Sequence, residues 1–415
     1  MINNPSVLNI DPNLKSWIPY SEDSDFPIQN LPLGVYSRNQ DPKKLCSIIG
    51  DQIIDLSSLA GLSEALGISN SFFTNNSLNP LMAHGKATLR NIRRYLSEVF
   101  SIQNLNRASF EKSLIPRQQV ELHLPIQCGD YTDFYSSKEH ATNVGIMFRD
   151  PANALLPNWL HLPVGYHGRA SSIVVSGTPV VRPAGQIVNK DGEPPIYSKS
   201  RQLDFELEMA FVVGKGNDLA HPIPLSQTKE HIHGLMLFND WSARDIQKWE
   251  YVPLGPFLGK NFCSTISPWL IDLDALEPFA VENPIQDPQP LDYLHQTGKN
   301  NYNIELEVLL NGHPISHSNT KYLYWSMFQQ LAHHTVNGCN MRIGDICASG
   351  TISGPTPNSY GSMLELAWKG TKPITLPDGS TRVFLQDGDQ LELKAFAQGN
   401  GFRIGFGECK GTIVS

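Results

Sequence analysis

The chain has 415 residues, a formal net charge of −8 and 40% hydrophobic residues, so it is long enough for two domains with sizeable cores. It contains no run of five Lys or Arg residues, which argues against nucleic acid or an anionic membrane as a partner. Its apolar runs are also far shorter than a membrane span. We therefore expect neither a nucleic-acid partner nor a membrane partner.

The cysteine pattern bears on the cellular compartment and on metal binding. No two of the six cysteines form a C-x-x-C pair, and their density is low for a chain of this length. Their positions are Cys46, Cys128, Cys263, Cys339, Cys347 and Cys409. We expect reduced thiols in a cytoplasmic protein rather than a disulfide framework or a zinc site.

The N-terminal part of the chain combines short strands with one longer helix. Residues 46–56 predict two short strands around a Gly50-Asp51 turn. Leu89, Ile92, Leu96 and Val99 recur at helical spacing, which predicts an amphipathic helix from about residue 80 to residue 101.

A polar stretch at residues 116–119 is a plausible domain boundary. We expect an N-terminal domain over residues 1–118 and a second domain over residues 119–415.

The second domain shows many short strand-like segments separated by glycine and proline. Asn311-Gly312 predicts a tight hairpin, and residues 321–334 predict a helix. There is no β-α-β alternation and no glycine-rich nucleotide motif. We expect a mostly β (α+β) protein whose larger domain is a rolled or barrel-like mixed sheet.

Residues 203–213 predict a strand with an acidic face. Asp204, Glu206 and Glu208 alternate with apolar residues and so share one face, which continues into Ala210 and Val212. Two glutamates on one face of a strand repel each other, and a hard divalent cation bound to both would offset that repulsion.

The alternative is an ordinary solvent-exposed strand face that binds no metal. Residues 304–308 repeat the pattern with Glu305 and Glu307, which we interpret as solvated. The spacing alone does not decide between a metal site and a solvated face at Glu206 and Glu208.

Residues 239–251 predict a helix of about three turns. Asp240, Arg244, Gln247 and Tyr251 would then lie on one helical face. Such a row suits a ligand with carboxylate or carbonyl groups, with Asp240 reaching a metal, but an exposed face with an Asp240–Arg244 ion pair is equally compatible. Lys260 follows in a loop rich in glycine and proline, where it either faces a ligand or is an ordinary surface lysine.

Residues 129–143 and 158–168 are loops rich in histidine, tyrosine and glycine, a composition that is enriched at binding sites. His140 is a candidate general base. A lone histidine is more often structural, and the catalytic interpretation requires a carboxylate that orients the ring.

Taken together, these segments resemble the fumarylacetoacetase family. The resemblance runs over nearly the whole chain and is densest at residues 129–137, 154–170, 239–245 and 249–260. It implies a small SH3-like β-barrel N-terminal domain, a large C-terminal catalytic domain with a mixed β-roll fold, and a homodimer.

The resemblance also implies roles for individual residues. The Ca²⁺ or Mg²⁺ ligands would be Asp133, Glu206, Glu208 and Asp240, with accessory cation contacts at Lys260 and Ser264. The catalytic groups would be His140 as general base, Glu365 as the carboxylate that orients it, and Arg244, Gln247 and Lys260 facing the developing oxyanion. The substrate contacts would be Tyr135, Arg149, Tyr166, Gln247, Tyr251 and Thr351.

One departure from the family pattern lies near this site. Cys263-Ser264 stands where the family pattern has Gly-Thr. Ser264 retains a hydroxyl that can serve the accessory cation contact, whereas Cys263 adds a side chain. The sequence therefore does not decide whether a second cation site is present.

The implied activity is the metal-dependent hydrolysis of a carbon–carbon bond in a β-diketo acid, 4-fumarylacetoacetate. The products would be fumarate and acetoacetate, at the last step of tyrosine and phenylalanine breakdown. His140 would activate water, and the metal would stabilise the enolate leaving group. The group that protonates the carbanion is left open.

Two rival interpretations are compatible with parts of the sequence. An acylpyruvate hydrolase or a keto-acid decarboxylase of the same superfamily would typically have a shorter chain without the N-terminal domain. A non-catalytic calcium-binding protein would not need His140 and Glu365, and the sequence contains no EF-hand loop.

Overall fold

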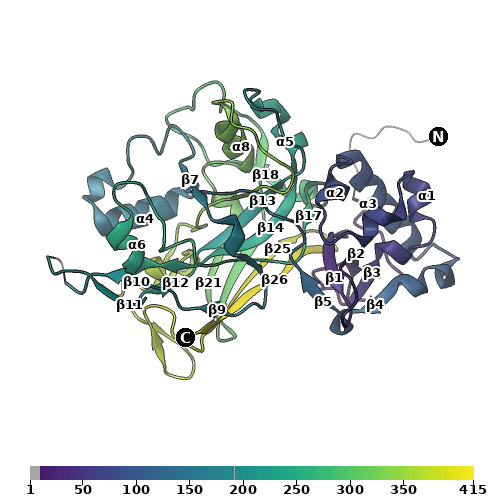
Figure 1. Ribbon diagram of the computed structural model, residues 1–415. Helices are drawn as coiled ribbons and strands as arrows, with labels where there is room; N and C mark the ends of the chain where they lie inside the picture. Colours follow the sequence, from purple (N-terminus) through teal and green to yellow (C-terminus); the bar gives the residue numbers. More distant parts are fainter. Residues whose placement is uncertain (1–9, 191) are drawn as a thin grey trace.

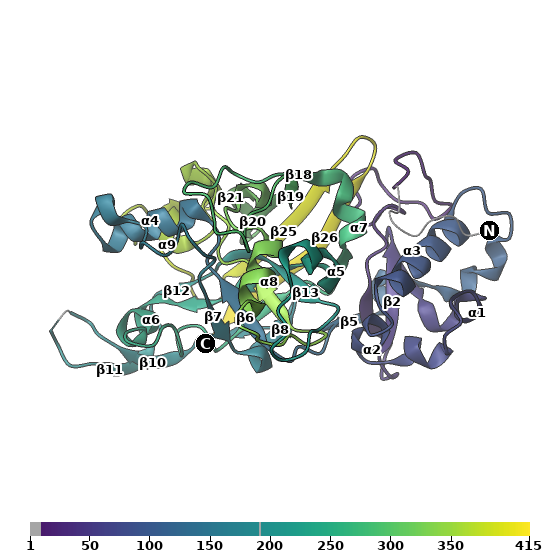
Figure 2. The same ribbon diagram turned by 90° about the horizontal axis from the view of Figure 1, so that it is seen from above.

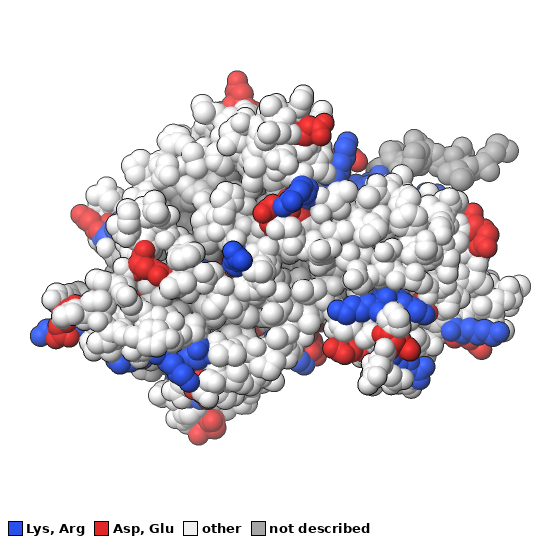
Figure 3. Space-filling model, in the orientation of Figure 1, with Lys and Arg blue, Asp and Glu red and all other residues white. Residues whose placement is uncertain are grey.

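The computed structural model describes residues 10–190 and 192–415. Figure 1 shows two parts side by side, with the N-terminal part on the right and a larger body of strands on the left. Within the described residues, no helix is both long enough and apolar enough to cross a lipid bilayer. On the face shown in Figure 3, acidic and basic residues are interspersed and form no broad area of one sign.

The N-terminal part is built on a five-stranded antiparallel sheet. Its strand order is β4-β3-β2-β1-β5. The strands are β1 (Gly34–Ser37), β2 (Lys44–Ile49), β3 (Gln52–Asp55), β4 (Leu114–Pro116) and β5 (Glu121–His123). The predicted hairpin over residues 46–56 is confirmed, because β2 pairs with β3 across a turn in which Gly50 has a φ of +54°.

The predicted helix over residues 80–101 is interrupted. It consists of α2 (Asn79–Met82) and α3 (Lys86–Phe100), separated by Gly85, whose φ of +82° is incompatible with a continuous α-helix. Leu89, Ile92 and Leu96 of α3 are buried against the sheet, as their spacing predicts. A short helix, α1 (Leu62–Leu66), packs beside α3.

The division at residues 118/119 stays a prediction. Strand β5 lies C-terminal to this division and pairs with β1 of the N-terminal sheet, with Val35 opposite His123.

The larger body contains two main sheets. The first has the order β7-β6-β22-β13-β14-β16-β8, with β17 pairing with β14. Its strands are β6 (Tyr131–Phe134), β7 (Gly165–Gly168), β8 (Ile173–Val175), β13 (Leu207–Val213), β14 (Ile232–Asp240), β16 (Ser264–Ile266), β17 (Ile271–Asp272) and β22 (Ile346–Ala348).

The second sheet has the order β21-β20-β25-β26-β9. Its strands are β9 (Val180–Val181), β20 (Glu305–Leu310), β21 (His313–Asn319), β25 (Gln390–Gln398) and β26 (Arg403–Val414). Strand β14 of the first sheet packs on β25 and β26 of the second. Phe211, Leu237, Leu393 and Phe406 are buried in the apolar cluster that joins the two sheets, so the fold is mostly β, as predicted.

Smaller elements complete the body. The two-stranded sheets are formed by β10 (Ala184–Ile187) with β11 (Ile196–Lys199), β12 (Leu203–Asp204) with β15 (Ser242–Ala243), β18 (Ala280–Glu282) with β19 (Lys299–Tyr302), and β23 (Ile374–Thr375) with β24 (Thr381–Arg382). The helices are α4 (Lys138–Phe148), α5 (Thr228–His231), α6 (Arg244–Glu250), α7 (Leu273–Leu276), α8 (Met327–Thr335) and α9 (Met363–Leu366). Figure 2 shows α4, α9 and α6 at the end of the body that lies away from the N-terminal part.

Two further predictions concern the second half of the chain. The Asn311-Gly312 hairpin is confirmed, since both residues have positive φ and join β20 to β21. The helix predicted over residues 321–334 begins later than expected, at Met327, where the Ser326 and Gln329 side chains form a capping box.

The helix predicted over residues 239–251 is wrong in its first third. Asp240 is the last residue of β14, and only Arg244–Glu250 form a helix, α6. Asn239 pairs with Leu207 on one side and with Thr265 on the other, and this pairing holds the segment extended. Asp240, Arg244, Gln247 and Tyr251 therefore do not share one helical face.

The strand predicted over residues 203–213 is interrupted as well. It is divided into β12 and β13, and Glu206 between them forms a single bridge with Ser362. All residues from Leu203 to Val213 are buried, so neither face is solvated. Glu305 and Glu307 are only half-buried, which is consistent with their interpretation as a solvated pair.

Candidate active site

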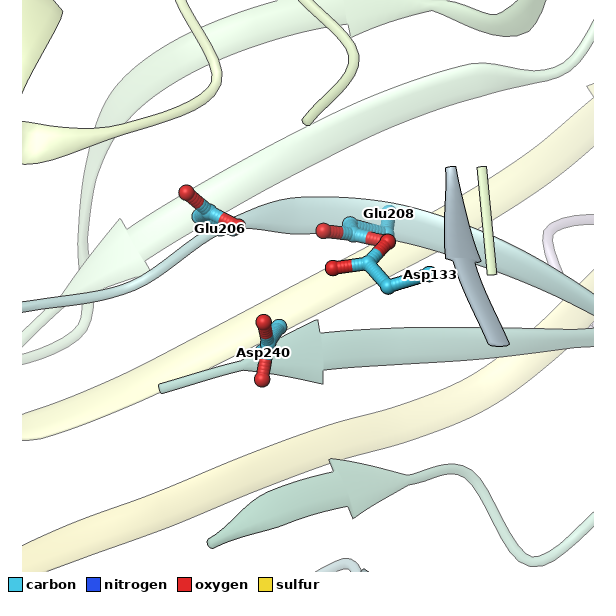
Figure 4. A group of neighbouring side chains, drawn as sticks. All are labelled: Asp133, Glu206, Glu208 and Asp240. Carbon is cyan, nitrogen blue, oxygen red and sulfur yellow. The ribbon is translucent and has the colours of Figure 1, made fainter. Parts of the chain in front are cut away.

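Four carboxylates converge in the first sheet of the larger body. Asp133 on β6, Glu206 before β13, Glu208 on β13 and Asp240 at the end of β14 each offer one oxygen, and these oxygens lie within 4.8 Å of one another. All four residues are buried, none being more than 6% exposed. Figure 4 shows Asp133 beside Glu208 and Asp240 across from them on the neighbouring strand. We call these residues the carboxylate quartet.

The sheet register explains why residues so distant in sequence meet. Strands β6, β22, β13 and β14 are consecutive neighbours, and Leu207 is opposite Asn239. Asp240, the next residue along β14, therefore lies beside Glu206. The Glu206 carbonyl oxygen accepts a hydrogen bond from the Asp240 N–H at 3.4 Å. The Asn239 side chain in turn accepts a hydrogen bond from the backbone N–H of Glu206.

The quartet fits a divalent cation by its chemistry. Glu208 Oε1 and Asp133 Oδ1 are buried oxygens without a hydrogen-bond partner among the described residues. A buried acceptor left without a partner is costly, and hard cations such as Ca²⁺ and Mg²⁺ prefer oxygen ligands of this type. The quartet could therefore hold a divalent metal ion.

Electrostatics support the same conclusion. Burial raises the pKa of Asp133 and of Glu208 well above the ordinary carboxyl range, and the charges of neighbouring carboxylates raise both further. Burial also raises the pKa of Asp240, against the lowering effect of Lys260. Burial would raise the pKa of Glu206 too, but Lys260 and Arg244 outweigh it and hold that pKa below its ordinary value.

Two cations border the quartet, the buried Lys260 and the largely buried Arg244. The Lys260 ammonium donates to Glu206 and, at 2.8 Å, to Asp240 Oδ2. Arg244 Nη1 lies 2.8 Å from Glu206 Oε1, and its Nε donates to Asp204 Oδ2 at 2.8 Å. With Asp204, five buried carboxylates face only these two cations, and this imbalance favours a bound dication.

His140 and Glu365 form a buried pair near the quartet. Ser137 caps the N-terminus of α4, and three residues later His140 places its Nδ1 2.7 Å from Glu365 Oε2 on α9. A carboxylate partner at Nδ1 favours the tautomer with the proton on Nδ1, which leaves Nε2 unprotonated. Tyr135 packs edge-on against the imidazole at a centroid distance of 5.1 Å.

Three residues that were not predicted from the sequence hold Glu365. Asn143 donates to Oε1 at 2.9 Å, the Ser353 hydroxyl lies 2.9 Å from both carboxylate oxygens, and the Ser362 hydroxyl lies 2.9 Å from Oε2. Burial would raise the pKa of Glu365, but His140, Asn143 and Ser353 outweigh it and lower the pKa. Ser362 and Glu365 have the S-x-x-E spacing of a helix N-cap, a sequence signal that was available.

Other predicted site residues are hydrogen-bonded to Asp240 or to Arg244. Ser264 on β16 donates to Asp240 Oδ1 and Tyr166 on β7 donates to Asp240 Oδ2, each at 3.0 Å. The Gln247 side chain accepts a hydrogen bond from Arg244 at 3.3 Å. Lys260 has only donors in its side chain, so a cation contact from this residue would have to come from its carbonyl oxygen, and that assignment stays a prediction.

The remaining predicted substrate contacts differ in exposure. Thr351 is buried, and its Oγ1 has no hydrogen-bond partner among the described residues. Tyr251 is 50% exposed at the C-terminal end of α6. Arg149 is exposed and donates to the Ala154 carbonyl at 2.6 Å. Their roles toward a substrate stay predictions.

Comparisons with known proteins agree with this architecture. Residues 29–125 match the family described as fumarylacetoacetase N-terminal, and residues 131–414 match fumarylacetoacetate (FAA) hydrolase C-terminal. The chain is 55% identical to the fumarylacetoacetase of Homo sapiens over 96% of this chain and 98% of the relative. It is 53% identical to that of Dictyostelium discoideum over 97% and 98%, and 50% identical to that of Arabidopsis thaliana over 97% and 98%.

A solved structure shows the same fold at lower identity. The fumarylacetoacetate hydrolase from Exiguobacterium antarcticum superposes with a TM-score of 0.53 at 16% identity, over 93% of this chain and 99% of the other. The family matches together span most of the chain, and the relatives match it at half or more of their positions over nearly full length. This chain therefore belongs to the fumarylacetoacetase family.

Proposed function

We propose that this protein hydrolyses 4-fumarylacetoacetate to fumarate and acetoacetate, the last step of tyrosine and phenylalanine breakdown. The observation that carries the proposal is the buried carboxylate quartet beside the His140–Glu365 pair, in a chain whose relatives are named fumarylacetoacetase. Cleavage of this carbon–carbon bond requires a nucleophile made from water and a way to stabilise the charge on the departing group.

In this proposal His140 is the general base. Glu365 holds the Nδ1 proton, so Nε2 can accept a proton from water as the water oxygen attacks the carbonyl carbon next to the double bond. The hydroxyl group is added to the fumaryl carbon, the bond to the acetoacetyl carbon breaks, and that carbon takes up a proton. The buried donors around Glu365 keep it ionised, so that it stabilises the imidazolium formed in the first step.

Arg244, Gln247 and Lys260 are the proposed donors to the developing oxyanion. Arg244 Nη2 is buried without a hydrogen-bond partner among the described residues, so its two N–H groups are available. The Lys260 ammonium has three donors and uses two of them on Glu206 and Asp240. Preorganised donors of this kind in a site from which water is excluded contribute roughly 3–4 kcal/mol each to transition-state stabilisation.

We propose Ca²⁺ or Mg²⁺ as the cation held by Asp133, Glu206, Glu208 and Asp240. Bound there, it would act as a Lewis acid toward the β-diketone and the departing enolate. Tyr135, Arg149, Tyr166, Gln247, Tyr251 and Thr351 are the proposed substrate contacts.

We also propose a cytoplasmic homodimer. An apolar surface that is exposed in the single chain supports the dimer: Trp249, Val252, Leu254 and Phe257, on α6 and the loop after it, are between 46% and 97% exposed. Sedimentation velocity would measure the mass in solution, and a monomer at micromolar concentration would contradict this part of the proposal.

The activity is tested by incubating the protein with 4-fumarylacetoacetate and following the loss of diketone ultraviolet absorbance. We expect turnover that stops on chelation and returns with Ca²⁺ or Mg²⁺. Full activity after exhaustive metal removal would contradict the role of the metal. Preferential turnover of acylpyruvates would instead support the rival hydrolase.

A further inference from the structure

Asp204 is a fully buried carboxylate two residues before Glu206, and its hydrogen bonds go to three different segments. Its Oδ2 accepts from Arg244 Nε at 2.8 Å and from the Leu364 N–H at 3.1 Å. Its Oδ1 accepts from the N–H groups of Met363 at 2.7 Å and Phe205 at 2.8 Å. Both carboxylate oxygens are therefore fully engaged.

These contacts connect the two halves of the proposed site. Met363 and Leu364 begin α9, the short helix that carries Glu365 and through it orients His140. On the other side, Arg244 bridges from Asp204 to Glu206 of the carboxylate quartet. No other carboxylate among the described residues is bonded both to α9 and to Arg244.

We propose that Asp204 is a positioning residue that holds the His140–Glu365 pair in a fixed position relative to Arg244 and the quartet. The inference rests on the proposed hydrolysis, in which water activated by His140 must meet a carbonyl group held by the other half of the site. A misplacement of about 1 Å between such groups costs on the order of 100-fold in rate, so one buried anion that binds both halves has a direct effect on turnover.

This role requires two acceptor oxygens, which the carboxylate of Asp204 supplies. An asparagine at position 204 has one acceptor oxygen and one NH₂ group. If the NH₂ group replaces Oδ2, it faces two donors, Arg244 Nε and the Leu364 N–H. If it replaces Oδ1, it faces the Met363 and Phe205 N–H groups. Asparagine therefore satisfies one set of donors and repels the other, although its size is unchanged.

The experiment compares Asp204→Asn with Asp389→Asn. Asp389 is an equally buried aspartate that accepts from Arg382 Nε at 2.9 Å and from the Gln386 N–H at 2.8 Å, and it has no hydrogen bond to a residue assigned to the site. We expect kcat to fall about 10- to 100-fold in Asp204→Asn with KM within about threefold, and both to be nearly unchanged in Asp389→Asn at a similar Tm. Equal kcat values for the two variants would overturn the proposal.

Calorimetric Ca²⁺ titration separates positioning from simple support of the metal. The proposal requires the Ca²⁺ affinity of Asp204→Asn to stay close to that of the wild type. If the affinity falls enough to explain the whole loss of turnover, Asp204 supports only the quartet and the proposal is wrong. If Asp204→Asn does not fold, Asp204→Ser removes the charge with a smaller side chain and is measured in the same way.

Proton NMR of His140 needs neither metal nor substrate, so its result does not depend on whether the proposed function is correct. The Nδ1 proton of His140, held by Glu365, should give a downfield proton NMR signal that is absent from His140→Ala. We expect Asp204→Asn to broaden or abolish this signal and Asp389→Asn to retain it. An unchanged signal in Asp204→Asn overturns the proposal, whereas a wild-type protein that fails to cleave 4-fumarylacetoacetate contradicts the proposed function alone.

Discussion

His140 Nδ1 and Glu365 Oε2 are 2.7 Å apart, although 225 positions separate the two residues in the chain. The pair is buried, and α4 and α9, which supply it, lie side by side. This relationship gives the imidazole one defined tautomer and orientation, which a general base needs.

Glu365→Gln should lower kcat by roughly 10²–10⁴-fold, because a neutral amide neither fixes the Nδ1 proton nor stabilises the imidazolium. KM should change much less. Steady-state kinetics with 4-fumarylacetoacetate measures both. Glu139→Gln, on the same helix as His140, is the control and should keep near-normal turnover. Wild-type kcat in Glu365→Gln would show that the pair does not activate water.

Ser353→Ala should make the protein less resistant to acid. The pKa of Glu365 is lowered from its ordinary value of 4.5, so its ionised form contributes stability above that value, and this contribution is lost as the pH falls through the lowered pKa. Removing the Ser353 donor raises the pKa of Glu365 back toward 4.5, so the contribution is smaller at neutral pH and its loss is complete at a higher pH.

Urea unfolding of wild type, Ser353→Ala and Ser353→Thr between pH 3 and 7 measures the effect of Ser353. Threonine keeps the hydroxyl and should resemble the wild type. A stability difference between wild type and Ser353→Ala that does not vary with pH would exclude an effect through the ionisation of Glu365.

Glu208→Gln should stabilise the metal-free protein while weakening cation binding. The pKa of Glu208 is raised well above 4.5, so the folded state binds this proton more tightly than the unfolded state, and stability falls as the pH rises through the raised pKa. Glutamine removes this effect, so we expect a higher free energy of unfolding at pH 7 without metal.

Thermal unfolding with chelator and calorimetric Ca²⁺ titration test the two effects of Glu208→Gln. We expect Ca²⁺ affinity to fall at least about tenfold, since a charged ligand is lost. Glu307→Gln on β20 is the matched control, because Glu307 belongs to a similar acidic strand but is half-buried. Tighter Ca²⁺ binding in Glu208→Gln would contradict the assignment of the quartet.

Gly145→Ala should disturb α4. A Cβ atom at Gly145 would lie 2.1 Å from the Ala154 carbonyl oxygen, which is backbone and cannot simply move aside. We expect a stability loss of roughly 1–3 kcal/mol and a lower kcat, because α4 carries His140. Urea unfolding and kinetics measure these effects. The control is Ile146→Ala at the neighbouring exposed position, which should leave both stability and kcat nearly unchanged. A Gly145→Ala protein as stable and as active as the wild type would refute this prediction.

The sequence by itself determined the local features of this protein. Period-two alternation identified the acidic strand, and the Asn311-Gly312 pair identified a hairpin, because side-chain alternation and positive φ are set by neighbouring residues. The resemblance added the family and the roles of residues such as Asp133 and Glu365. From spacing alone, however, Glu206 and Glu208 were hardly distinguishable from Glu305 and Glu307.

Only the tertiary structure decided which of these carboxylates are buried and what they face. Asp240 has helix-like spacing to Arg244, yet pairing with β13 and β16 on both sides keeps it in a strand and brings it to Glu206. Asp204 carries no signal in the sequence that points to α9, because its partners lie about 160 residues away. Strand register and long-range packing set such contacts, and the local pattern of residues does not contain them.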